Sequence, residues 1–344
     1  MQRSSGSAQQ PALKSTVSSA ERPAQQLAVL QCLEKEGWLV TPLLNGCRIA
    51  VLSRACKQAL EGWPSRLERL EFLEMHSDDL VARKLQWVAH HCPQLWYLVL
   101  EQQLPNGGNL SEAIQAVARS CSRLKHLDVG GNSVSNAAIE TVAQACPQLE
   151  CLCLAECGVT DAALWAVAQG CPQLKKLDVS ENLVSNAAIE TVAQACSQLE
   201  CLCLAYCDVT DAALWAVAQG CPQLKELDLS LNWVSNAAIQ AVAQACPQLK
   251  KLNVTYCTNL RDEAIDAVAR GCPQLEYLQV GGLRITDAAI HAVAQGCPQL
   301  KQLDITQCAM LTESAIVSIV QSCTHLECLK HSICGRAVRI QYYL

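Results

Sequence analysis

Apolar positions along this chain change their spacing once within each segment of about 25 residues. In residues 146–170, Leu152 and Leu154 are two apart, which is the spacing of a β-strand that buries one face. Thr160 and Asp161 then provide the signal for a helix start. Four apolar residues follow at the i, i+3, i+4 and i+7 spacing of a helix: Leu164, Val167, Ala168 and Cys171. The segment therefore predicts a strand, a turn and a helix.

The same segment recurs along most of the chain and is marked by the tetrapeptide Cys-Pro-Gln-Leu or a close variant. Successive copies are 25 or 26 residues apart after a first interval of 29. The marker cysteines are Cys92, Cys121, Cys146, Cys171, Cys196, Cys221, Cys246, Cys272, Cys297 and Cys323. A weaker first copy begins near Pro64, which gives about ten repeats and a partial unit from Cys323. One unit cannot bury its own apolar face, so we expect the copies to stack.

The repeat resembles the cysteine-containing subclass of the leucine-rich repeat. That subclass reads roughly Leu-x-x-Leu-x-Leu-x-x-Cys-x-x-Ile-Thr-Asp, followed by a helix that ends in Cys-Pro. The matching residues in one unit are Leu149, Leu152, Leu154, Cys157, Val159, Thr160, Asp161, Leu164, Cys171 and Pro172. The resemblance covers residues 64 to about 335. It implies an α/β fold, a leucine-rich repeat solenoid (horseshoe) with a concave parallel sheet and convex helices.

A second period of two repeats lies on top of the first. Residues 121–170 and 171–220 are identical at 41 of 50 positions, so we expect the two copies to have equivalent structures. The turn position after each strand alternates between two residue types: Asn132, Cys157, Asn182, Cys207, Asn232 and Cys257. The resemblance implies that this side chain points inward and bonds the backbone of the neighbouring loop. The duplication is compatible with diversification for binding and with duplication without functional pressure.

The composition excludes several classes of protein. Aromatic residues are only 4% of the chain, with a single Phe, so the core consists of small residues that suit thin stacked layers. The net charge of -6 argues against a nucleic-acid partner, which needs Lys and Arg against the phosphates. No run of about 18 apolar residues is present, so we expect no membrane partner.

The 23 cysteines are expected to be free thiols. Residues 1–14 contain no apolar core of a secretion signal, which favours a reducing compartment, the cytoplasm or alternatively the nucleus. Zinc binding, redox sensitivity and simple packing are alternatives for the four cysteines expected on the inner face of strands: Cys151, Cys153, Cys201 and Cys203. The two Cys-x-Cys pairs are two repeats apart, about 10 Å, which is too far for one tetrahedral zinc site. We therefore expect no metal.

No catalytic motif is present: the sequence lacks Gly-x-Ser-x-Gly, a Walker loop and His-Glu-x-x-His. A row of carboxylates is expected on the sheet at Asp128, Asp178, Asp228 and Asp304. Neighbouring carboxylates can perform acid–base chemistry. These carboxylates, however, are expected on an open sheet without a pocket, which favours a solvated face whose side chains point to solvent. The sequence thus predicts neither an enzyme nor a cofactor.

The concave face of the sheet is the predicted binding surface, because repeat solenoids recognise partners over long arcs of exposed side chains. Beyond residue 63 the chain has 28 acidic and 19 basic residues, so its carboxylate row favours a protein substrate with a basic segment. A merely solvated sheet face is the alternative. On the helical side, Trp165 and Trp215 are separated by Glu190 and form no continuous patch. The expected partner-binding residues are Tyr97, His126, Asp128, Lys176, Asp178, Glu226, Asp228, Lys251, Asn253, Tyr277, Gln279 and Asp304.

Three regions are expected along the chain. Residues 1–25 are rich in Ser, Gln and Ala and predict a disordered tail. Residues 26–63 contain apolar residues at the spacing of short amphipathic helices, and residues 64–344 form the solenoid with its C-terminal cap.

The segment Val51–Ala59 resembles the helix that ends an F-box, of the type Leu-x-x-Val-Cys-Lys-x-Trp. The usual Leu-Pro start is not clear, and Ala59 stands where the F-box has Trp. The resemblance implies a Skp-type adaptor as a partner, with contacts at Leu44, Leu52, Cys56 and Lys57. The alternative is a helical cap that covers the open end of the solenoid core.

Two functional hypotheses follow. The resemblance to F-box and leucine-rich repeat proteins implies a substrate-recognition subunit of an SCF-type (cullin-RING) ubiquitin ligase, with catalysis carried out by other subunits. The second hypothesis is a scaffold or interaction protein that has only a capping helix at its N-terminus. Binding to the adaptor distinguishes the two.

Overall fold

The computed structural model describes the repeat region of the chain. By its internal contacts the chain divides into Met1–Glu61 and Gly62–Leu344. The predicted tail, the predicted helical region and its four expected adaptor contacts lie outside the described residues. The described residues are 67–72, 78–100, 110–333 and 336–341.

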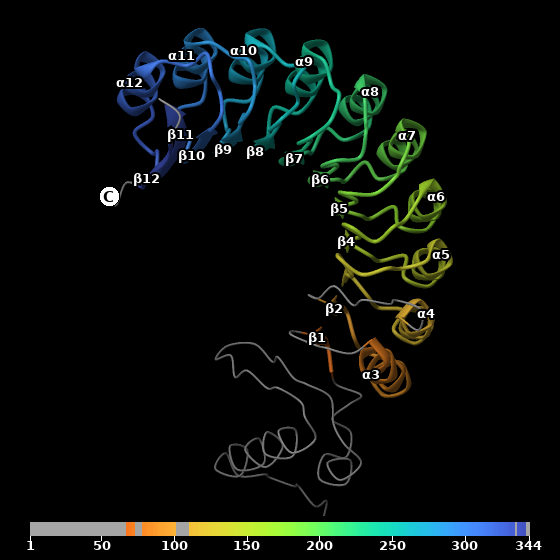
Figure 1. Ribbon diagram of the computed structural model, residues 1–344. Coiled ribbons are helices and arrows are strands. Elements are labelled where there is room, and N and C mark those ends of the chain that lie inside the picture. Colours follow the sequence, from red (N-terminus) through yellow and green to blue (C-terminus); the bar gives the residue numbers. More distant parts are fainter. Residues whose placement is uncertain (1–66, 73–77, 101–109, 334–335, 342–344) are drawn as a thin grey trace, which may run out of the picture. The chain divides into compact units, whose positions relative to one another are not determined.

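Strands and helices alternate through the unit Gly62–Leu344, and its strands form one 12-stranded sheet in chain order (Figure 1). The strands are β1 Arg69–Phe72, β2 Tyr97–Leu100, β3 His126–Asp128, β4 Cys151–Cys153, β5 Lys176–Asp178, β6 Cys201–Cys203, β7 Glu226–Asp228, β8 Lys251–Asn253, β9 Tyr277–Gln279, β10 Gln302–Ile305, β11 Cys328–Ile333 and β12 Arg336–Gln341. Strands β1 to β11 are parallel, whereas β12 pairs antiparallel with β11 and ends the sheet.

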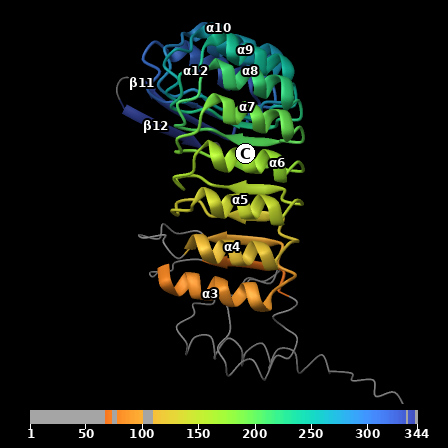
Figure 2. The same ribbon diagram turned by 90° about the vertical axis from the view of Figure 1, so that its right-hand side faces the viewer.

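The helices of this unit lie on the side of the sheet opposite the inner face of the arc (Figures 1 and 2). They are α3 Asp78–His91, α4 Leu110–Ser120, α5 Asn136–Ala145, α6 Asp161–Gly170, α7 Asn186–Ala195, α8 Asp211–Gly220, α9 Asn236–Ala245, α10 Asp262–Gly271, α11 Asp287–Gly296 and α12 Glu313–Ser322. The predicted fold is confirmed: the unit is a leucine-rich repeat solenoid with an inner parallel sheet. In the described part of the chain, no helix combines the length and apolarity needed to cross a bilayer.

The core consists of columns of small and medium apolar side chains. Leu152 and Leu154 of the strand segment and Leu164 of α6 are each at most 1% exposed. Burying each such side chain stabilises the fold by about 1.5–3 kcal/mol. The layers are thin enough that a Cβ added to Gly220, at the end of α8, would lie 2.2 Å from the Ala193 carbonyl oxygen of α7. Glycine is therefore required at this helix end by the close approach of the preceding helix.

The two near-identical cassettes fold alike. In residues 121–170 the elements are β3, α5, β4 and α6, and in residues 171–220 they are β5, α7, β6 and α8. Each element of the second cassette begins and ends 50 residues after its counterpart in the first. The expected equivalence of the copies is thus confirmed at the level of element bounds.

The alternating Asn and Cys of the turn position point inward, as the resemblance implied. Asn182 Nδ2 donates to the Leu154 carbonyl at 2.7 Å, and its Oδ1 accepts from the Val159 amide at 3.0 Å. In the next repeat, the Cys207 thiol donates to the Val179 carbonyl at 3.2 Å. The amide therefore satisfies two backbone groups of the preceding repeat.

The helix-end cysteines form a buried column. The Cys196 thiol donates to the Cys171 carbonyl at 3.5 Å, and the Cys171 thiol donates to the Cys146 carbonyl at 3.9 Å. Burial raises the pKa of Cys171 to about 12, so this thiol stays protonated at neutral pH. All the described cysteines are free.

The helix starts differ from the sequence expectation in one respect. Thr160 occupies the position before α6, but its side chain makes no capping bond to the helix. Instead, Asn136 of the preceding repeat donates to the Thr160 hydroxyl at 2.8 Å and accepts from the Thr160 amide at 3.0 Å. Asp161 in turn accepts from the Ser185 amide and hydroxyl at 2.7 and 2.6 Å. The cap residues thus join neighbouring repeats, because stacking brings the helix N-termini together.

Candidate functional site: the inner face of the sheet

The inner face presents side chains in rows, because each strand residue pairs with its counterpart in the next repeat. The first row contains Arg69, Tyr97, His126, Cys151, Lys176, Cys201, Glu226, Lys251, Tyr277 and Gln302. The middle row contains Glu71, Val99, Asp128, Cys153, Asp178, Cys203, Asp228, Asn253, Gln279 and Asp304. The third row, of smaller residues, contains Gly130, Ala155, Ser180, Ala205, Ser230, Thr255, Gly281 and Thr306.

The structure brings the twelve predicted partner-binding residues together in the first and middle rows. None of the twelve is buried. Val99, which the sequence pattern also places in the middle row, is buried at 5% exposure. The arrangement is a long and continuous surface rather than a closed pocket, and the binding role of its residues remains a prediction.

An aromatic and cationic cluster lies at the β1–β3 end of the first row. The Arg69 guanidinium lies 4.0 Å from the centroid of the Tyr97 ring. The Tyr97 and His126 rings stack with centroids 4.2 Å apart. Burial lowers the pKa of His126, so its ring is neutral at pH 7. Arg69, Tyr97 and His126 therefore form one stack of three groups at this end of the row.

The carboxylates of the middle row are not simply solvated, which corrects the expectation from sequence. The Ser180 amide donates to Asp178 Oδ1 at 3.0 Å, and the Ser230 amide donates to Asp228 Oδ1 at 2.9 Å. Both Asp side chains are half-buried. A short carboxylate at a strand end reaches the backbone amide two residues later and stabilises the turn. These residues therefore carry negative charge on the face and also hold the backbone.

Asn253 makes the same turn bond without a charge. It accepts from the Thr255 amide at 3.0 Å, and its Nδ2 donates to Asp228 Oδ2 at 2.8 Å. At the next acidic position, Asp304 forms an ion pair with Lys330 at 3.4 Å. Asn can therefore replace Asp in the middle row. It keeps the hydrogen bond to the turn and carries no negative charge.

The two Cys-x-Cys pairs of β4 and β6 lie on the inner face and are half-buried. Lys176 lies between Cys151 and Cys201 in the first row, so a full strand separates the two pairs. Burial raises the pKa of Cys151 to about 11. Within residues 67–341 as far as they are described, no group of three or more His, Cys, Asp or Glu side chains could hold a metal ion.

A ladder of Lys and Glu runs along the edge where the strands begin. Glu150 accepts from Lys125 and Lys175, each at 2.8 Å. Glu276 likewise pairs with Lys250 at 3.1 Å and with Lys301 at 2.6 Å. The hydrogen bonds from these lysines lower the pKa of both carboxyls. Sequence reasoning missed the ladder, although Lys or Glu follows the repeat marker from Lys125 to Lys301 and the two alternate except at Lys225 and Lys250.

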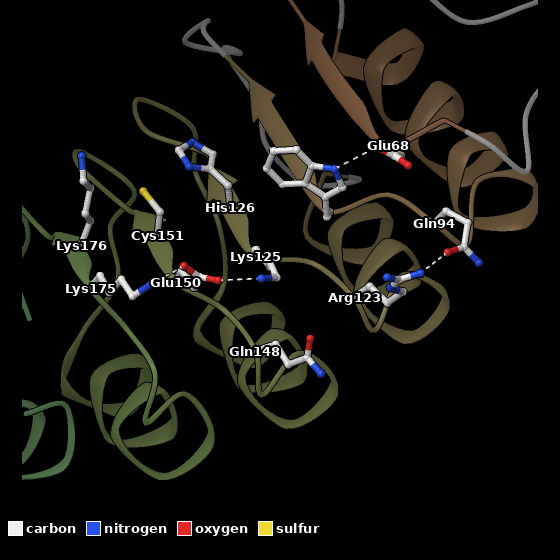
Figure 3. A pocket seen from close by; sticks show the side chains of 11 residues that line it. Glu68, Gln94, Arg123, Lys125, His126, Gln148, Glu150, Cys151, Lys175 and Lys176 are labelled. Atoms are coloured by element: carbon white, nitrogen blue, oxygen red, sulfur yellow. Dashed lines mark hydrogen bonds and ion pairs between the residues drawn. The ribbon is translucent and has the colours of Figure 1, made fainter. Parts of the chain in front are cut away.

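A groove of about 660 Å³ lies at this edge beside strands β3 to β5 (Figure 3). Glu150 lies between Lys125 and Lys175 within it, while Trp96 Nε1 donates to Glu68 Oε2 at 3.4 Å. Cations outnumber carboxylates in its lining, which is Glu68, Gln94, Trp96, Arg123, Lys125, His126, Gln148, Glu150, Cys151, Lys175 and Lys176. The strand-start edge is therefore more basic than the middle row.

A further row lies in the turns after the strands, and sequence reasoning missed it. We call it the turn row: Gly131, Glu156, Glu181, Tyr206, Leu231, Tyr256, Gly282 and Gln307. Its members all have left-handed backbone, with φ between 52° and 74°. Such a conformation favours glycine and destabilises other residues by about 1–3 kcal/mol.

The turn row is fixed by a backbone ladder. The Tyr206 amide donates to the Ser230 carbonyl and the Leu231 amide to the Thr255 carbonyl, both at 2.9 Å. Each side chain of the row is therefore held at the spacing of the repeats. Left-handed backbone at residues other than glycine has no periodic signal in the sequence. The row could have been found only from the large apolar residues next to the turn Asn or Cys.

Comparison with known proteins gives two sequence matches. The family model for the leucine-rich repeats of the FBD-associated F-box protein At5g56370 matches residues 186–263. F-box/LRR-repeat protein 23 of Arabidopsis thaliana is 31% identical over 97 residues, which cover 27% of this chain. The matched segment spans only 21% of that relative's length.

Solved structures that resemble the chain are distant in sequence. An internalin (inlF) from Listeria monocytogenes is 17% identical with a TM-score of 0.49, and the match covers 77% of this chain and 81% of that chain. A chain of the yeast Rad7 and Elc1 complex is 18% identical with a TM-score of 0.47, and the match covers 86% and 90% of the two chains.

Proposed function

We propose that this leucine-rich repeat protein, whose repeats are similar to those of F-box proteins, is a substrate-recognition subunit of an SCF-type (cullin-RING) ubiquitin ligase. In this role the inner face of the solenoid holds a protein destined for ubiquitin-dependent degradation. Other subunits transfer ubiquitin, so this chain supplies no catalytic residue and needs no cofactor.

The observation that carries the proposal is the continuous inner face, on which rows of mixed polar side chains remain unburied over successive strands. Such a surface suits a protein or an extended peptide, which can contact several repeats at once. The family-model match to repeats of an F-box protein supports the assignment to this class of interaction protein.

The adaptor side of the proposal depends on residues 26–63. Their resemblance to an F-box at Val51–Ala59 supports docking of a Skp-type adaptor through Leu44, Leu52, Cys56 and Lys57. These residues lie outside the described part of the chain, so the support is from sequence alone.

We propose that the substrate presents a basic segment to the middle row. Asp128, Asp178 and Asp228 repeat along this row, and the chain beyond residue 63 has more acidic than basic residues. Opposite charge accelerates association and fixes the register of binding. The same proposal places the protein in the cytoplasm or nucleus, in agreement with its free cysteines.

Capture of partners by the full-length chain tests the inner face. The middle-row variant combines Asp178→Asn with Asp228→Asn, which removes charge and keeps the turn bond that Asn253 makes naturally. The matched helix-face variant combines Trp165→Ala with Trp215→Ala, two exposed residues of the outer side. Proteins bound by the wild type, quantified by mass spectrometry, should fall at least fivefold with the middle-row variant and persist with the helix-face variant. The reverse pattern would place the binding site on the helices.

The second candidate function is a scaffold whose N-terminal segment only caps the solenoid. It shares the inner-face binding surface and differs in having no affinity for the adaptor. Titration with a purified Skp-type adaptor therefore separates the two functions.

A further inference from the structure

We propose that the turn row from Glu156 to Tyr256 is a second docking surface, which binds a partner segment that carries Arg or Lys beside apolar side chains. The inference rests on the proposed role in protein recognition and adds a surface outside the strands of the inner face.

Three consecutive repeats expose large apolar side chains at the same place. Tyr206 is 61% exposed, Leu231 is 48% exposed and Tyr256 is 41% exposed. The backbone ladder of the turn row holds these residues on successive rungs, about 5 Å apart. They therefore form one continuous apolar strip rather than scattered surface residues.

The turns beside the strip carry further contacts and exposed apolar side chains. The Tyr256 ring lies against Gly282, where an added Cβ would be 2.4 Å from the ring, and its hydroxyl donates to Gln307 Oε1 at 2.6 Å. Two residues beyond the turn row, Leu183 is 83% exposed and Trp233 is 59% exposed. Five of the ten exposed large apolar side chains in the described residues therefore gather along these turns.

The backbone conformation of these turns does not require the three side chains. All three have left-handed backbone, with φ of 52°, 60° and 57°, and glycine occupies the same place at Gly131 and Gly282. Glycine would meet the conformational requirement with less strain. Apolar side chains that are both exposed and backbone-strained indicate a role in recognition.

The charge of the turn segments indicates the kind of partner. The turn segments 130–134, 155–159, 180–184, 205–209 and 230–234 contain Glu156, Glu181 and Asp208 but no Lys or Arg, whereas Arg261 donates to two carbonyls of the turn that follows Tyr256. Partial desolvation and the neighbouring Glu156 raise the pKa of Glu181, so a cation between the two carboxyls would relieve their repulsion. The Tyr and Trp rings also attract cations. An acidic end followed by an apolar strip complements a basic and apolar segment.

A defined peptide tests the surface with the full-length protein. The probe is a fluorescein-labelled 12-residue peptide of alternating Arg and Leu, and binding is measured by fluorescence anisotropy. Two matched peptides replace every Arg by Glu or every Leu by Ser. The account predicts binding of the Arg–Leu peptide and at least tenfold weaker binding of each matched peptide. Absence of binding to the Arg–Leu peptide overturns the proposal.

Glycine substitution locates the site and keeps the fold. The glycine variant combines Tyr206→Gly, Leu231→Gly and Tyr256→Gly, which removes the side chains and relieves the left-handed strain. It should bind the Arg–Leu peptide at least tenfold more weakly than the wild type, with a Tm that is unchanged or higher. A variant with Tyr206→Asn and Leu231→Asn, which the left-handed backbone also tolerates, should show the same loss.

Three results contradict the assignment. Unchanged peptide affinity in the glycine variant removes the turn row as the site. A marked fall in Tm of that variant makes the side chains structural. A wild-type dimer that becomes a monomer with the glycine variant, measured by light scattering, makes a second copy of this chain the occupant.

The outcome is independent of the test of the inner face. If the glycine variant binds the peptide normally while the middle-row variant loses its captured partners, the turn row fails and the proposed function stands. If the middle-row variant captures partners normally while the glycine variant loses the peptide, the inner-face site fails and the turn row stands.

Discussion

At the scale of single residues, Asn and Cys at the turn position both form hydrogen bonds to the backbone of the preceding repeat, but these bonds differ in strength. Asn182 bonds both the Leu154 carbonyl and the Val159 amide, whereas Cys207 donates to the Val179 carbonyl through a weaker thiol. Both side chains are buried at 3% exposure. The stability of a repeat therefore depends on which of the two residues occupies its turn.

We expect Asn182→Ala to lower the free energy of unfolding by about 1–3 kcal/mol, because it leaves the buried Val159 amide without its partner and removes one of the two hydrogen bonds that the Leu154 carbonyl accepts. Asn182→Cys should lose about half as much, since the native cysteines at this position still bond the preceding carbonyl. Urea denaturation followed by circular dichroism measures both changes. Equal losses for the two variants would show that the amide has no special role.

Residue identity alone did not reveal two features of the inner face and the adjoining turns. Alternation and the repeat length predicted which side chains share a row, because strand geometry fixes that order. The hydrogen bond that the Ser180 amide donates to Asp178 and the left-handed backbone of Tyr206 depend on local torsion angles instead. The pattern Asp-x-Ser gave a usable signal for the first feature, whereas nothing in the sequence period marks the second.

At the scale of elements, the Lys–Glu ladder belongs to the stacking of strands rather than to any one repeat. Glu150 and Glu276 each receive hydrogen bonds from lysines of the two adjacent repeats, which lowers the pKa of both carboxyls. The folded state thus holds these groups as stronger acids than the unfolded state. Their contribution to stability is present above the ordinary pKa of Glu and is lost as pH falls through the lowered pKa.

We expect the variant Glu150→Gln with Glu276→Gln to lose less stability between pH 6 and pH 3 than the wild type. The difference should be about 1 kcal/mol or less for each carboxyl, because both ion pairs are partly exposed and screened. Urea midpoints at pH 6, 4 and 3 measure it. Glu140→Gln, on the exposed side of α5, is the control and should follow the wild type. Identical acid dependence of the double variant and the wild type would contradict a role for the ladder.

At the scale of the whole molecule, the proposed function needs two binding activities in one chain, first for the substrate and second for the adaptor. Residues 1–63 have seven basic and four acidic residues, whereas the remainder has 19 basic and 28 acidic residues. The inner face and the turn row both carry carboxylates and are proposed to bind a substrate, whereas the N-terminal segment is proposed to bind the adaptor. A scaffold would need only the first activity, so adaptor binding decides between the two functions.

The most direct test is isothermal titration of the full-length chain with a purified Skp-type adaptor. The account predicts a one-to-one complex that is weakened at least tenfold by Leu52→Glu with Cys56→Glu and is unchanged in the middle-row variant. Circular dichroism confirms that each variant retains the fold of the solenoid. Absence of adaptor binding by the folded wild-type chain would contradict the ligase assignment and leave a leucine-rich repeat scaffold.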